Sequence, residues 1–319
     1  MLKGNDLDSK KYFLFDIDGT LAIDDTIYDG SRELLDYIES IGGRAFYITN
    51  NSVKSRKDYI EKFKKWNISA VENQFVTASY ATCKYLKEHY EDKKLLVVGT
   101  PSFEEELKSF RLKLTHEAEE DVACVVVGFD RTLVYEKVEE ACKALFRPEV
   151  DFVGTNPDYR CPTAFGFVPD CGGICEMLKV TTDRTPYYAG KPNAQIVKMC
   201  MEQVGANPEE VLVVGDRLYT DIACGINAGV ETALVYTGEA KPENLVATEF
   251  MPDYAFENIR KLYEAFRKSR EAVTEGKNPD IQMCSKQIYF PSCILARHIS
   301  KQIPTYLFHL NVWHLVFLA

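Results

Sequence analysis

The strongest structural signal in this chain of 319 residues is the segment at 12–21, Tyr12-Phe13-Leu14-Phe15-Asp16-Ile17-Asp18-Gly19-Thr20-Leu21. Four apolar residues without polar alternation predict a strand that is buried on both faces, as in a parallel sheet. Asp16 and Asp18 then stand at the carboxyl end of that strand, where open α/β sheets bind their ligands. Side chains two residues apart in a strand share one face, so both carboxylates can point into one site.

An Asp-x-Asp-Gly pattern also occurs in turns and in calcium-binding loops. A calcium loop of the EF-hand type would carry a glutamate at its twelfth position and would lie between two helices. Counted from Asp16, the twelfth position is Ile27, and an apolar strand precedes the motif. The context therefore favours a site at the end of a strand.

Further polar groups follow apolar runs later in the chain. The run 44–49 predicts a second buried strand, and a helical pattern at 30–42 separates this strand from the first. The run 211–215 predicts a further buried strand. A strand, a helix and a parallel strand form a right-handed unit, which places the ends of these strands at one edge of the sheet. The polar residues expected at this edge are Thr49, Asn50, Asn51, Asp216 and Asp221, joined by Lys191 after Gly190.

The segment between these groups repeats the alternation of strands and helices. Strands are predicted at 94–99, 123–128 and 152–154, and a helix at 135–146. The predicted fold class is therefore α/β, with a Rossmann-like parallel-sheet core at 11–90 and 185–270 and an inserted α/β domain at 91–184. Residues 271–319 are predicted to be an atypical C-terminal tail.

Composition limits the classes of partner. A net charge of −10 argues against nucleic acid and anionic membranes as main partners. The first eleven residues lack the apolar core of a signal peptide, and ten cysteines without such a signal indicate a reducing cytoplasm. The apolar run at 306–319 is interrupted by His309, Asn311 and His314, which argues against a transmembrane helix.

The order of these groups resembles the four motifs of the haloacid dehalogenase superfamily of phosphohydrolases. The size of the insert resembles the class II cap, and within that class the chain is similar to the NagD and 4-nitrophenylphosphatase group (class IIA). The segments that carry this likeness are Thr155-Asn156-Pro157-Asp158, Cys171-Gly172-Gly173, Gly190-Lys191-Pro192 and Gly215-Asp216-Arg217-Leu218-Tyr219-Thr220-Asp221. The resemblance covers about residues 11–270 and leaves the tail out.

The resemblance implies a Mg²⁺-dependent phosphatase of small-molecule phosphate monoesters, with a nucleotide, a sugar phosphate, phosphoglycolate or 4-nitrophenyl phosphate as substrate. Asp16 would form an aspartyl-phosphate, and Asp18 would act as general acid and base. Thr49, Asn50, Asn51 and Lys191 would bind the phosphoryl group. Asp16, Asp216 and the backbone carbonyl of Asp18 would bind Mg²⁺, and Asp221 would orient the metal's ligands. Asn156, Asp158 and a loop at 171–173 are candidates for reading the leaving group.

Other interpretations stay open at this point. Taken singly, Asp216 and Asp221 suit helix caps, Lys191 suits a surface position, and Thr49 with the two asparagines suits a turn. A catalytically idle homologue that binds a metabolite would keep the fold without the reaction, and a protein phosphatase would use the inserted domain to dock a partner. The resemblance also implies a homo-oligomer formed through the cap.

Overall fold

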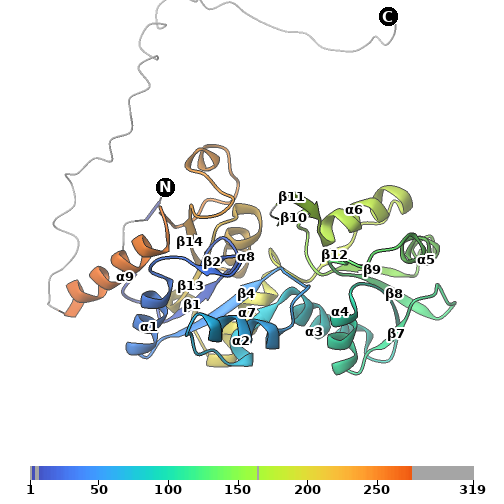
Figure 1. Cartoon of the computed structure of the whole chain (residues 1–319), viewed down its shortest axis with the longest axis horizontal. Helices are drawn as coiled ribbons and strands as arrows, with labels where there is room; N and C mark the ends of the chain where they lie inside the picture. Colours follow the sequence, from blue (N-terminus) through green and yellow to red (C-terminus); the bar gives the residue numbers. More distant parts are fainter. Residues whose placement is uncertain (1, 4–6, 164, 275–319) are drawn as a thin grey trace, which may run out of the picture. The chain divides into compact units, whose positions relative to one another are not determined.

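The structure is a computed structural model, and it describes residues 2–3, 7–163 and 165–274 (Figure 1). The predicted tail lies outside the described residues from 275 onward. In the part of the chain that the structure describes, every helix is too short or too polar to cross a bilayer.

The first sheet has six parallel strands in the order β15-β14-β13-β1-β4-β5. Its strands are β1 (Tyr12–Phe15), β4 (Arg44–Thr49), β5 (Phe75–Thr77), β13 (Val211–Gly215), β14 (Glu231–Val235) and β15 (Tyr254–Phe256). In the register of the sheet, Phe15 lies opposite Tyr47 of β4 and Val214 of β13. The ends of these three central strands therefore lie next to each other, as the sequence predicted.

Helices cover both faces of this sheet. They are α1 (Ser31–Ser40), α2 (Arg56–Lys65), α3 (Ala78–Tyr90), α7 (Gln195–Val204), α8 (Ala223–Ala228) and α9 (Ile259–Thr274). Phe13 and Phe15 pack into one core cluster with residues of α1, α2 and α9, while Leu14 packs into another with residues of α3, α7 and α8. Because successive side chains alternate between faces, one buried strand holds two helical layers in place.

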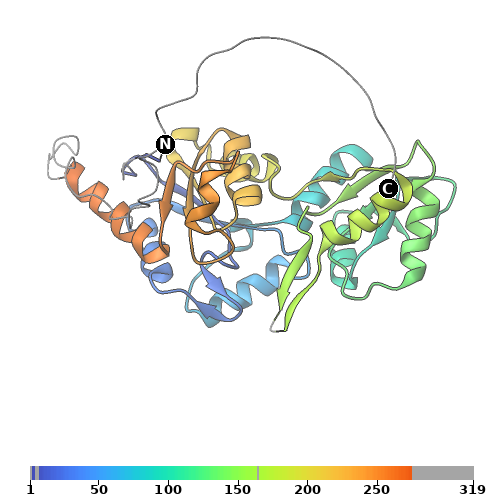
Figure 2. The same cartoon turned by 90° about the horizontal axis from the view of Figure 1, so that it is seen from above.

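The second sheet has five parallel strands in the order β12-β9-β8-β6-β7. They are β6 (Lys94–Val98), β7 (Lys113–Thr115), β8 (Val122–Val127), β9 (Asp151–Gly154) and β12 (Tyr187–Tyr188). The helices of this segment are α4 (Pro101–Ser109), α5 (Tyr135–Leu145) and α6 (Cys171–Thr182). The strands and helices of this segment have teal and green colours in Figure 2. Since β12 pairs with β9, this sheet reaches past residue 184, the boundary predicted for the inserted domain.

One prediction of local structure was wrong. The segment 171–173 is the first turn of α6 rather than a loop, because Asp170 caps the helix and accepts a hydrogen bond from the Cys171 amide at 2.6 Å. Gly172 is needed there, since a Cβ would lie 2.2 Å from the carbonyl oxygen of Pro157. The segment after Asp18 contains a short hairpin, β2 (Ala22–Ile23) and β3 (Thr26–Ile27).

Smaller elements complete the described fold. The hairpin of β10 (Arg160–Thr163) and β11 (Gly166–Pro169) precedes α6. Short 3₁₀ turns lie at Glu72–Gln74, Pro208–Glu210 and Pro242–Val246, and a π-helical turn at Leu218–Ile222 leads into α8.

Candidate active site

Three carboxylates converge at the carboxyl edge of the first sheet. Asp16 follows β1, Asp216 follows β13, and Asp221 lies in the π-helical turn after it. One oxygen from each lies within 4.8 Å of the other two, and all three residues are buried. Burying three like charges together is unfavourable unless cations lie among them.

Lys191 supplies one such cation. Its side chain is 2% exposed, and its Nζ donates to Asp16 Oδ1 at 2.6 Å and to Asp221 Oδ1 at 2.7 Å. A third bond, to the carbonyl oxygen of Ile48 at 3.0 Å, ties the ammonium to β4. Lys191 thus offsets part of the negative charge, and three carboxylates still face one ammonium.

Asp216 presents an oxygen to this cluster that the protein does not satisfy. Its Oδ2 accepts from the Glu239 amide at 2.7 Å, whereas its buried Oδ1 has no hydrogen-bond partner among the described residues. Backbone approaches this carboxylate closely, since a Cβ on Gly238 would lie 2.0 Å from Oδ2 and one on Gly19 2.8 Å from it. Buried hard oxygens with surplus negative charge suit a small divalent cation such as Mg²⁺.

Proton affinities in the cluster reflect the same crowding. Burial raises the pKa of Asp16 well above its usual range, although Lys191 opposes the shift. Burial and the neighbouring Asp221 raise the pKa of Asp216 to about 7. Burial lowers the pKa of Lys191, but Asp16 and Asp221 more than offset this, so its pKa lies above the ordinary value.

Asp18 lies apart from this cluster. Its side chain is 40% exposed, and its Oδ1 pairs with Nζ of Lys62 at 3.2 Å. The next residue, Gly19, has a φ of 102°, a conformation that favours glycine and turns the chain toward Asp216. The two carboxylates of the first motif therefore have different surroundings, one buried in the acidic cluster and one partly open to solvent.

The polar residues after β4 lie beside Lys191. Asn50 holds the backbone of Lys191 on both sides, because its Oδ1 accepts from the Lys191 amide at 2.9 Å and its Nδ2 donates to the Lys191 carbonyl at 3.0 Å. Thr49 Oγ1 accepts from the Asn51 amide at 3.2 Å, and Asn51 Oδ1 accepts from the Val53 amide at 3.0 Å. These bonds fix the turn that ends β4 next to the acidic cluster.

Comparison with known proteins agrees with this geometry. A family model described as haloacid dehalogenase-like hydrolase matches residues 13–113, and one described as HAD-hydrolase-like matches 188–262. An acid sugar phosphatase of Staphylococcus haemolyticus is 31% identical over 261 residues, which make up 82% of this chain and 98% of that protein. The chain belongs to the haloacid dehalogenase-like hydrolases.

Solved structures of this hydrolase family share the fold. A 4-nitrophenylphosphatase from Thermotoga maritima has a TM-score of 0.76 and 34% identity, and the match covers 82% of this chain and 98% of that one. A glycerol phosphate phosphatase from Mycobacterium tuberculosis, solved in complex with magnesium, has a TM-score of 0.75 and 25% identity, covering 82% and 78%. The predicted family, the α/β fold class and the assignment as a hydrolase of phosphate monoesters are confirmed.

In this hydrolase, Asn156 and Asp158 are buried and bonded to the protein. Asp158 Oδ2 accepts from Asn50 at 2.9 Å and from Asn156 at 3.0 Å, and Asp158 Oδ1 accepts from Arg217 at 2.9 Å. Asn156 also donates to Asp170 at 3.2 Å and accepts from the Thr155 hydroxyl at 2.7 Å. These side chains join the segment of the second sheet to Asn50 and to Arg217, the neighbour of Asp216.

Sequence reasoning missed three groups of the site. Arg217 was quoted in a motif without a role, yet it is mostly buried and its guanidinium bonds Asp158. The Glu239 amide, from the turn after β14, and the Lys62 ammonium were not among the groups predicted for the site. Burial distinguishes Lys62 from its exposed neighbour Lys64, and the sequence holds no signal for it.

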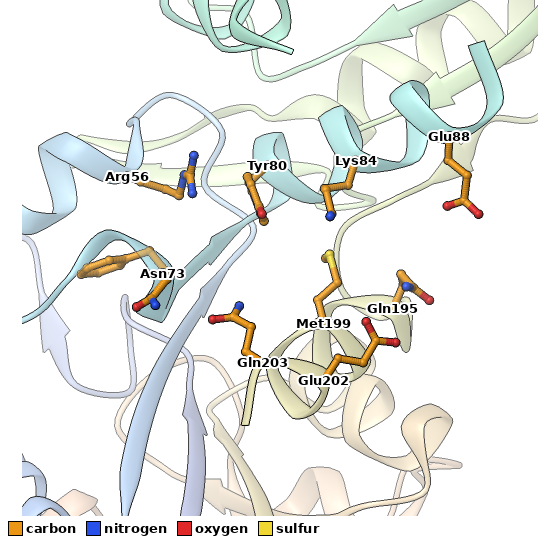
Figure 3. A pocket seen from close by; sticks show the side chains of 10 residues that line it. Arg56, Asn73, Tyr80, Lys84, Glu88, Gln195, Met199, Glu202 and Gln203 are labelled. Atoms are coloured by element: carbon orange, nitrogen blue, oxygen red, sulfur yellow. The ribbon is translucent and has the colours of Figure 1, made fainter. Parts of the chain in front are cut away.

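A pocket of about 590 Å³ lies elsewhere on the hydrolase, lined by residues of α3 and α7 together with Arg56, Asn73 and Phe75 (Figure 3). Figure 3 shows Lys84 and Glu88 on one side and Glu202 and Gln203 on the other. None of the predicted site residues is among the described side chains that line it. The candidate active site is therefore the acidic cluster, where buried charge is concentrated, rather than this pocket.

Proposed function

We propose that this hydrolase cleaves phosphate monoesters of small molecules with Mg²⁺ and through a phosphoryl group carried on Asp16. The observation that carries the proposal is the buried Asp16 carboxylate, held by Lys191 within a cluster of three acids. Phosphate monoesters hydrolyse very slowly without help, so the site must supply a nucleophile, neutralise charge and protonate the leaving group.

Asp16, Asp216 and the backbone carbonyl of Asp18 would hold Mg²⁺. The unpartnered Oδ1 of Asp216 supports this assignment. Asp221 accepts from Lys191 through Oδ1 and from the Arg217 amide through Oδ2, the latter at 3.0 Å. Since both oxygens of Asp221 are engaged by the protein, we assign Asp221 to orienting the site rather than to direct ligation. When bound, the ion would offset the negative charges of the substrate and the nucleophile.

The chain's own residues then carry the reaction. An oxygen of Asp16 attacks phosphorus, the bond to the ester oxygen breaks, and Asp18 gives its proton to the departing alcohol. Asp18 next takes a proton from a water molecule as the water attacks the aspartyl-phosphate, which releases phosphate and restores Asp16. Lys191 and the turn at Thr49, Asn50 and Asn51 would bind the phosphoryl oxygens.

The segment 91–184 is proposed as a cap that reads the leaving group. Its links to the core support this role, because Asp158 bonds both Asn50 and Arg217. The names of the relatives point to small esters, since they are an acid sugar phosphatase, a 4-nitrophenylphosphatase and a glycerol phosphate phosphatase. We propose small phosphorylated metabolites as substrates and association of two copies through the cap, which light scattering would test.

Phosphate release from a panel of small phosphate esters, with and without Mg²⁺, tests the proposal. The wild type and Asp16→Asn are compared, and we expect activity that requires Mg²⁺ and is lost in the variant. Lys64→Met, which removes an exposed ion pair with Glu61, serves as a control that should keep full activity. If the wild type binds an ester but releases no phosphate, a metabolite-binding role replaces the phosphatase, and turnover of phosphopeptides alone would favour a protein phosphatase.

A further inference from the structure

Lys62 is a buried cation that the proposed chemistry has not yet used. It lies on α2, its side chain is 7% exposed, and its Nζ is 3.2 Å from Asp18 Oδ1. The ammonium also lies over the ring of Trp66, 4.9 Å from the ring centroid. Lysine is rarely this buried unless it has a partner, so the position of Lys62 calls for a reason.

The helix that carries Lys62 is firmly fixed. Tyr59 and Phe63 are fully buried, and Phe63 packs edge-on against Tyr47 of β4 with ring centroids 4.4 Å apart. A capping box between Ser55 and Asp58 fixes the beginning of the helix. A side chain on such an element is held more precisely than one on a loop.

The same helix face also anchors the chain that follows Asp18. Trp66 stands four residues after Lys62, which places both side chains on one face of the helix. Trp66 Nε1 donates to the carbonyl oxygen of Asp25, between β2 and β3, at 2.8 Å. Lys62 therefore contacts Asp18, while Trp66 holds the hairpin that begins four residues after Asp18.

We propose that Lys62 is a positioning residue that holds the Asp18 carboxyl group in the orientation needed for proton transfer. The inference rests on the proposed role of Asp18 as general acid and base. Lys62 engages Oδ1, and Oδ2 is the oxygen that we assign to the proton. In the first half-reaction the proton passes from Asp18 to the leaving oxygen, and in the second from water to Asp18, while Lys62 keeps its own protons throughout.

This role predicts a dependence on the leaving group. An alkyl ester has a strongly basic leaving oxygen and needs the acid, whereas 4-nitrophenolate leaves without much help. General acid catalysis contributes about 10²- to 10⁴-fold, and a misplaced acid forfeits part of that factor. Lys62→Met should therefore slow transfer of the phosphoryl group from an alkyl ester at least about tenfold more than transfer from 4-nitrophenyl phosphate.

The experiment measures single-turnover phosphorylation of the full-length enzyme with Mg²⁺, using glycerol phosphate and 4-nitrophenyl phosphate. Lys62→Met is compared with Lys62→Arg, which keeps a cation and should restore part of the rate, and with Lys64→Met on the same helix, which should change nothing. Asp18→Asn lacks the general acid, so it should slow the reaction of glycerol phosphate much more than that of 4-nitrophenyl phosphate. This difference between the two substrates is the full leaving-group signature. Equal slowing of both substrates in Lys62→Met, or no slowing, would overturn the inference.

Two further results keep the outcomes apart. If Lys62→Met does not fold, as judged by its thermal transition, Lys62→Gln is measured in its place. Its slowing with glycerol phosphate is compared with its slowing with 4-nitrophenyl phosphate in the same way. If Asp16→Asn remains active, the proposed function itself fails. If Asp16→Asn is inactive and Asp18→Asn shows the leaving-group signature while Lys62→Met does not, the positioning role alone fails.

Discussion

Replacing Lys191 by methionine should destabilise the protein strongly, because it leaves Asp16 and Asp221 buried without their cation. The lysine is 2% exposed and donates to both carboxylates at 2.6 and 2.7 Å, so no water can readily take its place. Removing one partner of a buried ion pair costs about 3–5 kcal/mol, a large share of a total stability of about 5–15 kcal/mol. We expect Lys191→Met to lose about 3–5 kcal/mol in urea unfolding at pH 8 without added metal.

The loss should depend on pH in a defined direction. Lys191 lowers the pKa of Asp16, so its removal raises that pKa further above the usual range. A protonated carboxyl group needs no cation, and the destabilisation should therefore shrink as the pH falls. Lys11→Met, which removes a surface pair with Glu210, is the matched control and should change stability far less. Equal, small losses for both variants at pH 8 would refute the reasoning.

Two other predictions concern single groups near the site. Burial raises the pKa of Asp170 from 3.8 to about 6, so the folded state holds this proton more tightly than the unfolded state, and stability should fall by about 2 kcal/mol as the pH rises from about 4 to 6. Asp170→Asn, which keeps a cap for α6, should lack this component in urea titrations at several pH values, and an unchanged pH dependence would contradict the assignment. Gly238→Ala would place a Cβ 2.0 Å from Asp216 Oδ2 and should weaken Mg²⁺ activation about 10- to 100-fold. Glu239→Gln keeps the amide that bonds Asp216 and should retain the affinity, so equal Mg²⁺ titration curves for the two variants would count against the role of the turn.

The sequence predicts the centre of the fold because its strongest patterns lie there. The runs that end at Phe15, Thr49 and Gly215 are almost wholly apolar, and strands buried on both faces need this composition. Parallel pairing then brings the following polar residues to one edge, which is why Asp16 and Asp216 are found together.

The parts that sequence reasoning missed depend on contacts between distant segments. Gly172 and Gly173 make the beginning of α6 difficult to predict, because glycine disfavours helices. Glycine is needed at position 172 because the backbone of Pro157 approaches it closely. Lys62 resembles its solvated neighbours on a basic helix until Asp18, 44 positions earlier, is placed beside it. The proposed roles of the site residues stay predictions until they are measured.

The central claim is that Asp16 carries the phosphoryl group, and trapping that adduct tests it most directly. Asp18→Asn would be mixed with 4-nitrophenyl phosphate and Mg²⁺, quenched in acid and digested, and the peptide containing Asp16 examined by mass spectrometry. The departing 4-nitrophenolate needs little protonation, whereas release of the phosphoryl group needs the base, so the adduct should accumulate. We predict one added phosphoryl group on Asp16, and its absence while 4-nitrophenolate is still released with Mg²⁺ would contradict the account.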